Sequence, residues 1–386
     1  MSHQYGIQAA HVNKMEMVTG LGDYVVCSKE NQSDLFDCAR GGLGQCGIIT
    51  SVTIPLVKAP TNIRTYKLFY PASNSSLLLK DVKSFVNSGK FDMIHAFLKP
   101  CTKTTIMSIL GPDAFDTSST KFKELVQDGE SNKSLVYFLE LGCYLWDGLS
   151  PSISGNCEDI PNLFVSKENS FLNGEYFTNQ ADFSEYIRKD PPVVETNKEH
   201  GKIPHPSFAT LIDEDHAPML LDHHLASDAR GDDRTNEILI MPVKSNSNLS
   251  SGHNVPMFAL PKDSELSFFL LFLGSVVPKP QSDKSAAPSC SDQMSTIRAH
   301  HRKLYSLSTK LGGKRYSYDT ITAEVKGETE WKAHFGCQET WNKLVLQKRK
   351  FDPKHILCPG VDMFSDDRSS SGTAPETKEE WQTTID

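Results

Sequence analysis

The sequence lacks an apolar run long enough to cross a membrane. Its longest such run, residues 266–277, spans about a dozen positions, whereas a bilayer-spanning helix needs roughly 20. The N-terminus also lacks a basic segment followed by an apolar one, so we expect no signal peptide in the chain as given and no membrane association. Four N-x-S/T triplets are compatible with secretion, and the compartment stays open between cytoplasmic and secreted.

Basic residues are not in excess. The 386 residues include 40 Lys and Arg against 48 Asp and Glu, a formal net charge of −8, with no basic cluster that interleaves aromatic residues. This balance argues against a nucleic-acid partner. The hydrophobic content of 38% and charged content of 23% are ordinary for a globular protein of two domains or one composite domain.

Cysteine spacing excludes two kinds of small scaffold. The nine cysteines are scattered and form no C-x-x-C pair, so neither a zinc ribbon nor a dense disulfide framework is expected. Most of them are expected to be small buried hydrophobic residues.

Local catalytic and metal-binding motifs are also missing. The chain has no G-x-S-x-G, P-loop or H-E-x-x-H sequence. The stretch 213–233 is rich in Asp, Glu and His, but adjacent histidines do not share one helical face, so a solvated acidic loop is favoured over a metal site. His300 and His301 fall on an amphipathic pattern and are expected to be partly exposed. No metal is expected.

What is present is a mixture of helical and strand patterns. Strands are expected at 15–18, 24–27, 48–54, 135–145, 237–243 and 266–277, and helices at 34–40, 76–86 and 292–311. The β-branched segment 48–54 is expected to be buried on both faces.

The segment Gly42–Gly47 matches G-x-G-x-x-G. A Rossmann fingerprint must follow a strand and open a helix, whereas here a helix precedes the glycines and a strand follows them. We therefore reject dinucleotide binding of the Rossmann type. The glycines either allow close approach of a flat or phosphorylated ligand or form a tight turn in the core.

Two sets of distinctive motifs lie one at each end of the chain. The N-terminal set is Tyr5-Gly6-x-Gln8, Val18-Thr19-Gly20, Cys27-Ser28, Asp34-Leu35-Phe36 and Gly41-Gly42-Leu43-Gly44-Gln45-Cys46-Gly47-Ile48-Ile49-Thr50. The C-terminal set is Trp331-Lys332-Ala333-His334-Phe335-Gly336, Trp341, Lys348, Phe351-Asp352-Pro353 and Ile356-Leu357-Cys358-Pro359-Gly360-Val361. Both sets resemble the motifs of the cytokinin dehydrogenases, of the vanillyl-alcohol oxidase / PCMH-type flavoprotein superfamily, and follow that family's order.

The resemblance implies an α+β fold: a truncated PCMH-type FAD-binding domain with an inserted α+β substrate domain, an antiparallel sheet flanked by helices. Residues 1–58 and 321–364 would belong to the FAD domain, 59–320 to the substrate domain, and 365–386 to a disordered tail. Because neither end segment has enough apolar surface for a core of its own, we expect the two to pack together.

The resemblance also implies an FAD-dependent oxidoreductase that oxidises a secondary amine, such as an isoprenoid adenine, by hydride transfer to the flavin. The positions that it implies for the cofactor are Gly44, Gln45, Ile49, Tyr318, Cys358 and Val361. Those that it implies for the substrate are His95, Ser207 and Ala209, where the family has Glu, Trp and Asn. These three changes indicate an altered substrate pocket.

The family's covalently flavinylated His and its catalytic Asp have no counterpart in the chain as given. We therefore expect this chain to show neither covalent FAD nor amine oxidation by itself, with His95 the remaining candidate base. Two alternatives stay open: a related flavin oxidase that acts on alcohols or sugars, and a non-catalytic binding module.

Overall fold

A computed structural model of the chain describes residues 3–146, 163–164, 174–188, 206–227, 237–244, 255, 257, 259–261, 264–274, 276, 289–316, 327–358, 361 and 363–364. The chain forms two compact units, each built from separate stretches of sequence. Unit 1 comprises Met1–Asn13, Thr53–Val255 and Ala259–Ile321, and unit 2 comprises Lys14–Val52, Pro256–Phe258 and Thr322–Asp386. Both units combine antiparallel sheets with helices, which confirms the α+β class. The expected tail, 365–386, lies outside the described residues.

Unit 1 is organised around an eight-stranded sheet in which the strand pairings of the described residues are antiparallel. In spatial order its strands are β11 (Lys314–Arg315), β8 (Ser207–Asp213), β10 (Leu266–Leu273), β9 (Glu237–Lys244), β5 (Met93–Pro100), β6 (Leu135–Leu145), β4 (Asn62–Pro71) and β7 (Tyr176–Asp182). The predicted strands at 135–145 and 237–243 are confirmed as β6 and β9. The predicted strand at 266–277 is confirmed over 266–273, the residues of β10. Their apolar runs are long because these strands lie inside the sheet, where both faces contact other side chains.

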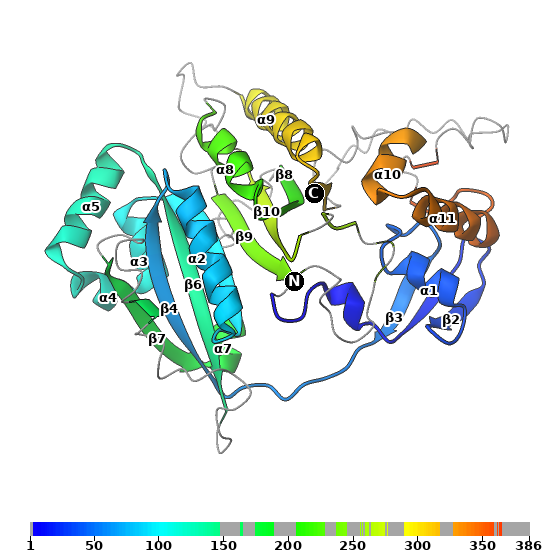
Figure 1. Ribbon diagram of the computed structural model, residues 1–386, viewed down its shortest axis with the longest axis horizontal. Coiled ribbons are helices and arrows are strands. Elements are labelled where there is room, and N and C mark those ends of the chain that lie inside the picture. Colours follow the sequence, from blue (N-terminus) through cyan, green and yellow to red (C-terminus); the bar gives the residue numbers. More distant parts are fainter. Residues whose placement is uncertain are drawn as a thin grey trace, which may run out of the picture. The chain divides into compact units, whose positions relative to one another are not determined.

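Three helices cover one face of this sheet (Figure 1). They are α2 (Ser75–Ser88), α8 (Ala217–Leu225) and α9 (Cys290–Lys310), and α8 packs on both of the others. The Tyr70 hydroxyl of β4 donates a hydrogen bond of 3.1 Å to Oδ2 of Asp81 on α2. The ring of Phe272 on β10 lies 5.2 Å from the ring of His224 on α8. We call this side the helix-covered face.

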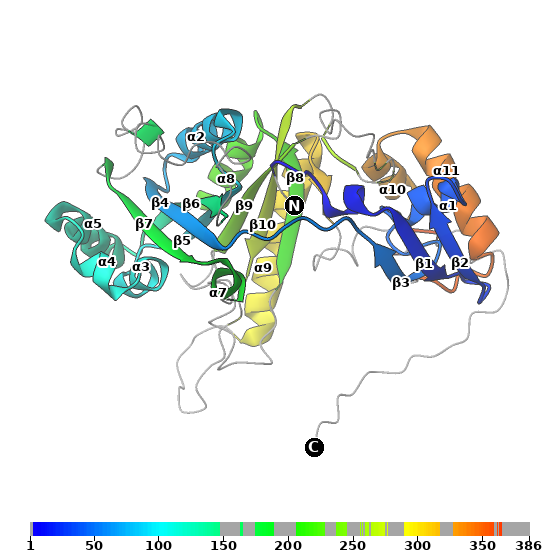
Figure 2. The ribbon, with the colours of Figure 1, turned by 90° about the horizontal axis from the view of Figure 1, so that it is seen from below.

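The opposite side, which we call the second face, is covered at one end (Figure 2). The helices there are α3 (Lys103–Leu110), α4 (Pro112–Asp116) and α5 (Thr120–Ser131). They pack against Phe69, Phe97 and Phe138, which strand register places on the second face. Farther along this face His95, Met241 and Leu271 stay partly exposed. The short helices η1 (Gln8–His11) and α7 (Phe183–Arg188) complete the described part of unit 1.

Helix α9 begins at a capping box in which the Ser289 and Asp292 side chains bond each other's backbone N–H groups. His300 and His301 on this helix are 3% and 2% exposed, so the expectation of partial exposure was wrong. His300 Nε2 lies 2.9 Å from His224 Nδ1, and His301 packs on Phe208. The spacing of the Leu and Ile residues correctly predicted the helix. It did not predict how many positions around the helix are buried, and these include both histidines.

The Asp- and His-rich stretch is not one solvated loop either. It begins at Asp213, the last residue of β8, and continues into α8, where His224 is 4% exposed. Residues 228–236 lie outside the described part. Among the described residues no group of three His, Cys, Asp or Glu side chains is arranged to hold a metal ion, and no helix is long and apolar enough to span a bilayer.

The described residues of unit 2 form a three-stranded sheet in the order β2-β1-β3 and three helices. These elements are β1 (Lys14–Val18), β2 (Tyr24–Ser28), β3 (Ile48–Thr53), α1 (Ser33–Ala39), α10 (Glu328–Phe335) and α11 (Gln338–Phe351). Helix α1 packs on α11, so the two ends of the chain share one unit. The largest buried side chains of this core, Trp331 and Trp341, come from the C-terminal segment, and Phe36 comes from the N-terminal one.

Strand β3 corrects another expectation. Every residue of β3 is exposed, so the segment is not buried on both faces. Among the described strands it lies at the edge of the sheet, with β1 as its one neighbour. Its β-branched residues favour an extended backbone wherever the strand lies, which is why the pattern identified the strand but not its burial.

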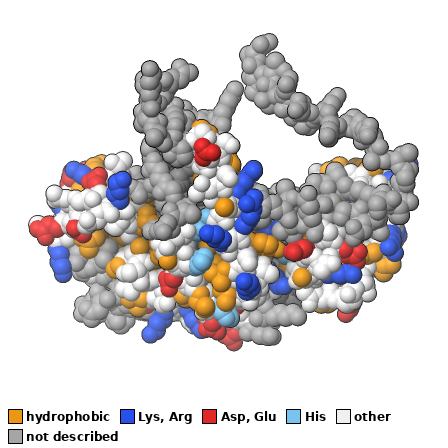
Figure 3. All heavy atoms as spheres, turned by 90° about the horizontal axis from the view of Figure 1, so that it is seen from above, with side chains coloured by type: hydrophobic (Ala, Val, Ile, Leu, Met, Phe, Trp, Pro, Cys, Tyr) orange, Lys and Arg blue, Asp and Glu red, His pale blue; other side chains and the backbone are white. Residues whose placement is uncertain are grey.

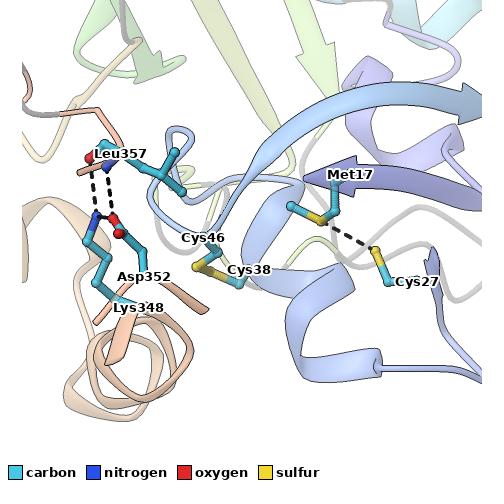
Figure 4. The surroundings of a disulfide bond; sticks show 7 residues. All are labelled: Met17, Cys27, Cys38, Cys46, Lys348, Asp352 and Leu357. Carbon is cyan, nitrogen blue, oxygen red and sulfur yellow. Dashed lines mark hydrogen bonds and ion pairs between the residues drawn. A yellow bond between two sulfur atoms is a disulfide. The ribbon is translucent and has the colours of Figure 1, made fainter. Parts of the chain in front are cut away.

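The described cysteines divide into four groups, one of which is Cys358 alone, a partly exposed thiol. Cys27, Cys101 and Cys143 are buried thiols, as expected, whereas Cys290 and Cys337 are exposed. Cys38 on α1 and Cys46 in the glycine segment form a disulfide that the sequence analysis did not predict, shown in Figure 4. Their separation of 8 residues matches no motif, and the pair forms because the glycines turn the chain back toward α1.

Candidate functional site

The glycine loop of unit 2, Gly42–Gly47, joins α1 to β3. The Gln45 side chain is buried, and its Nε2 donates to the Cys358 carbonyl oxygen at 3.5 Å. Gly44 has φ +73°, and a Cβ built on it would lie 2.6 Å from the Cys358 Sγ. The structure therefore brings together Gly44, Gln45 and Cys358, three of the expected cofactor positions.

The other expected cofactor positions are less closely connected. Ile49 lies on β3 with 43% of its surface exposed. Val361 is partly exposed, and its carbonyl oxygen accepts a 3.2 Å hydrogen bond from Trp331 Nε1. Tyr318 lies outside the described residues.

A buried ion pair holds the segment that carries Cys358 (Figure 4). Lys348 Nζ lies 2.6 Å from Asp352 Oδ2 and donates to the Leu357 carbonyl oxygen at 3.2 Å. Asp352 accepts two further hydrogen bonds, from the backbone N–H groups of Ile356 and Leu357. Sequence reasoning named Lys348 and Asp352 only as parts of the family motif. Their i,i+4 spacing at the end of an amphipathic helix was the available signal of a pair.

The contact between Gly44 and Cys358 gives a first prediction. Replacing Gly44 with Ala should lower the free energy of unfolding by about 1–2 kcal/mol more than Gly22→Ala does, measured by urea denaturation. Both glycines have positive φ, but a Cβ at Gly22 meets nothing within 4 Å, so this control isolates the strain of the backbone. Equal losses in the two variants would show that Gly44 does not pack against Cys358.

In unit 1 the three expected substrate positions share the second face of the sheet. His95 belongs to β5, and Ser207 and Ala209 belong to β8. In the strand pairings Phe97 lies opposite Leu239, Leu239 opposite Leu271, and Leu271 opposite Ala209, so these side chains share one face of the sheet. His95, two residues before Phe97 on the same strand, lies on that face too. Because β10 and β9 lie between β8 and β5, and His95 is offset along the strands by two residues from Ala209 and by four from Ser207, His95 lies about 16 Å from Ala209 and about 20 Å from Ser207, at roughly 4.8 Å per strand and 3.4 Å per residue. They can therefore contact opposite ends of one extended ligand, but not each other.

A small polar cluster surrounds His95 on this face. Glu140 lies directly opposite His95 in the β5–β6 pairing. The Tyr186 hydroxyl of α7 donates to Glu140 Oε2 at 3.0 Å and lies 3.4 Å from Met93 Sδ. Sequence reasoning missed both Glu140 and Tyr186, although a lone Glu inside the apolar run 135–145 was a visible signal.

Burial sets the protonation states in the cluster. It lowers the pKa of His95 to about 4, and the neighbouring His3 adds to this effect. His95 is therefore neutral at pH 7. Burial, followed by the charge of Glu140, raises the pKa of Tyr186, which keeps its hydroxyl a proton donor.

A depression of about 650 Å³ lies elsewhere in unit 1, between β6 and α5. Its lining includes Cys101, Asp128 and Lys133 but none of the expected substrate positions. It is therefore separate from the candidate site.

The fold is similar to those of several solved oxidoreductases. The structure resembles wild-type Phl p 4.0202, a glucose dehydrogenase, with a TM-score of 0.57 at 13% identity, covering 92% of this chain and 65% of that one. It also resembles the xylooligosaccharide oxidase of Myceliophthora thermophila C1, with a TM-score of 0.54 at 14% identity and coverage of 90% and 66%. At such identities the likeness concerns the fold alone.

Residues 60–364 match the family model described as "Cytokinin dehydrogenase 1, FAD and cytokinin binding". The chain belongs to this family of FAD-dependent oxidoreductases. It is 27% identical over 369 residues to cytokinin dehydrogenase 9 of Oryza sativa subsp. japonica. It is 26% identical over 371 residues to cytokinin dehydrogenase 1 of Arabidopsis thaliana. The match covers 94% of this chain in both cases, but only 63% of the rice protein and 58% of the Arabidopsis protein.

FAD is the cofactor of this family, and unit 2 offers a surface that suits its flat, largely apolar ring. Gly44 is partly exposed, although the space a Cβ would occupy there is taken by the Cys358 Sγ, and Ile49 presents exposed apolar surface on β3. Cys358 and Val361 are partly exposed. Gln45 fits a different task, since its buried amide already bonds the Cys358 carbonyl oxygen.

Proposed function

We propose that this protein acts in the FAD-dependent oxidation of a secondary amine, with an isoprenoid adenine as the representative substrate. Gly44, Ile49, Cys358 and Val361 would hold the flavin. His95, Ser207 and Ala209 would contact the substrate. Bound FAD would supply the acceptor for the hydride that leaves the carbon beside the amine nitrogen.

The observation that carries the proposal is that His95, Ser207 and Ala209 occupy one face of a single sheet. Residues on one rigid sheet keep a fixed spacing, as substrate-positioning groups require. The face around them is partly exposed and largely apolar, with Met241, Leu239 and Leu271 beside a few polar groups. Figure 3 shows the molecule from another side, where hydrophobic side chains lie among charged and histidine side chains. Such a surface suits a ligand with an apolar chain and a polar ring.

We assign His95 to substrate binding rather than to proton abstraction. A general base works best when its pKa lies near the working pH. The pKa of His95, lowered to about 4, leaves a neutral ring that accepts a proton only weakly at pH 7. A neutral imidazole still both donates and accepts a hydrogen bond.

The proposal predicts two binding properties of the 386-residue chain. Added FAD should bind reversibly and be released by acid precipitation, as judged by flavin fluorescence in the supernatant. An isoprenoid adenine should then change the absorption spectrum of the bound flavin. A sugar and a primary alcohol of similar size should change it much less.

An Ile49→Asp variant provides the control for flavin binding, since a charge on this exposed strand should weaken FAD binding at least ten-fold while the fold persists. Turnover is followed in parallel with a dye as electron acceptor. Turnover of the sugar or alcohol, but not of the amine, would contradict the proposal in favour of the alternative oxidase. Absence of any flavin binding would favour a non-catalytic binding module.

A further inference from the structure

The polar cluster on the second face contains a carboxylate one strand away from the position where the family resemblance implies one. The resemblance implies a substrate-contacting Glu at position 95, where this chain has His. Directly across the β5–β6 pairing, Glu140 projects from the same face. Side chains paired in this way have Cβ atoms about 5 Å apart, within reach of one ligand atom.

Resting on the function proposed above, we propose that Glu140 supplies the carboxylate acceptor for an N–H group of the amine substrate, with His95 as a second contact. Tyr186 is the positioning residue. Its hydroxyl holds Glu140 Oε2 at 3.0 Å, and α7 fixes Tyr186 over the sheet.

The chemistry of the cluster favours an N–H donor. A carboxylate has two oxygens with about four acceptor sites, so Glu140 can accept from a ligand in addition to its contacts within the protein, one of which is the hydrogen bond from Tyr186. His95 is neutral at pH 7, because burial lowers its pKa to about 4, so it does not neutralise the carboxylate as a cation would. Hydrogen bonds from N–H groups to a carboxylate are about twice as strong as those between neutral groups.

The apolar neighbours restrict the ligand further. Met93 lies against the Tyr186 hydroxyl, and Met241 and Leu239 belong to the adjoining strand β9. A ligand with many hydroxyl groups would leave several of them without partners on this surface, which is costly. A flat amine with one or two N–H groups and an apolar chain would leave few polar groups without partners.

The test is a binding cycle that needs no turnover. Isothermal titration with N6-isopentenyladenine is compared for the full chain and for Glu140→Gln, with Glu124→Gln as the matched control on exposed helix α5. Glu140→Gln should weaken binding about ten-fold or more, because the bond to a charged acceptor becomes a bond to a neutral one. Glu124→Gln should leave affinity unchanged, and Tyr186→Phe should weaken it by a smaller factor.

Two further measurements distinguish the loss of this contact from a folding defect of the variant. In the unsubstituted chain, methylation of the exocyclic N–H or of the ring N–H should weaken binding about ten-fold for one of the two analogues. That difference should disappear in Glu140→Gln. The double variant His95→Glu with Glu140→Gln, which moves the carboxylate across the strand pair, should recover most of the lost affinity.

Equal affinity of Glu140→Gln and the unsubstituted chain, or equal binding of all three adenines, would overturn this inference while leaving amine oxidation untouched. Affinity that depends on Glu140 without any flavin response would support the inference and contradict the proposed oxidation. If the unsubstituted chain bound none of the adenines, both would be overturned.

Discussion

Replacing Asp352 with Ala should lower the free energy of unfolding by about 3–5 kcal/mol, the usual loss when one partner of a buried ion pair is removed. The Asp352 and Lys348 side chains are 0% and 1% exposed, so the remaining ammonium would stay buried without its counter-charge. The substitution would also leave the backbone N–H groups of Ile356 and Leu357 without their acceptor. Urea denaturation followed by tryptophan fluorescence measures the effect, because Trp331 and Trp341 are buried in the same unit.

The chain offers a matched control in the same helix. Lys343 and Glu339 also form an i,i+4 pair, at 3.1 Å, but both side chains are largely exposed. Glu339→Ala should therefore change the free energy of unfolding by less than about 0.5 kcal/mol. The double variant Lys348→Met with Asp352→Leu should be less destabilised than Asp352→Ala, since no unpaired charge is left buried. A loss for Asp352→Ala as small as that for Glu339→Ala would show that the pair does not hold this segment.

The elements predicted best were those whose signal is local. Strand β6 matches its predicted range, and α9 agrees with prediction to within two residues at its start and one at its end. Each has a continuous apolar run or a helical repeat, and α9 has a capping residue before it and glycines after it. The family motifs in turn pointed to the glycine loop and Cys358, which the structure brings together.

Properties that depend on pairing between distant segments could not be predicted. The exposure of β3 depends on which strands lie beside it, and the pattern of β-branched residues carries no such information. The same holds for the cluster of His95, Glu140 and Tyr186. Its members come from two strands and a helix, and only the register places Glu140 opposite His95. The buried histidines of α9 were missed because a polar residue type was taken as a sign of exposure.

Those buried histidines lead to the second large prediction, a loss of stability in acid. Burial, with a smaller contribution from His300, lowers the pKa of His301 to about 3. His301 packs on Phe208, and among the described residues its Nδ1 has no hydrogen-bond partner. Between its folded pKa and the ordinary value near 6.5, the unfolded chain binds a proton that the folded chain does not. Stability is therefore present above about pH 6.5 and is lost as the pH falls.

At about 1.36 kcal/mol per pH unit, the loss from His301 alone should reach about 3 kcal/mol between pH 6.5 and pH 4. Replacing His301 with Leu removes the titrating group and should flatten the dependence of the free energy of unfolding on pH by that amount, measured by urea denaturation across this range.

The control is His223→Leu, on the exposed side of α8. His3 and His95, whose pKa values are also lowered to about 4, act in the same direction. They are present in both variants, so the difference between the two profiles reports His301. Identical profiles would mean that His301 is protonated as readily in the folded chain as in the unfolded one, and that the interior of unit 1 is open to water at this helix.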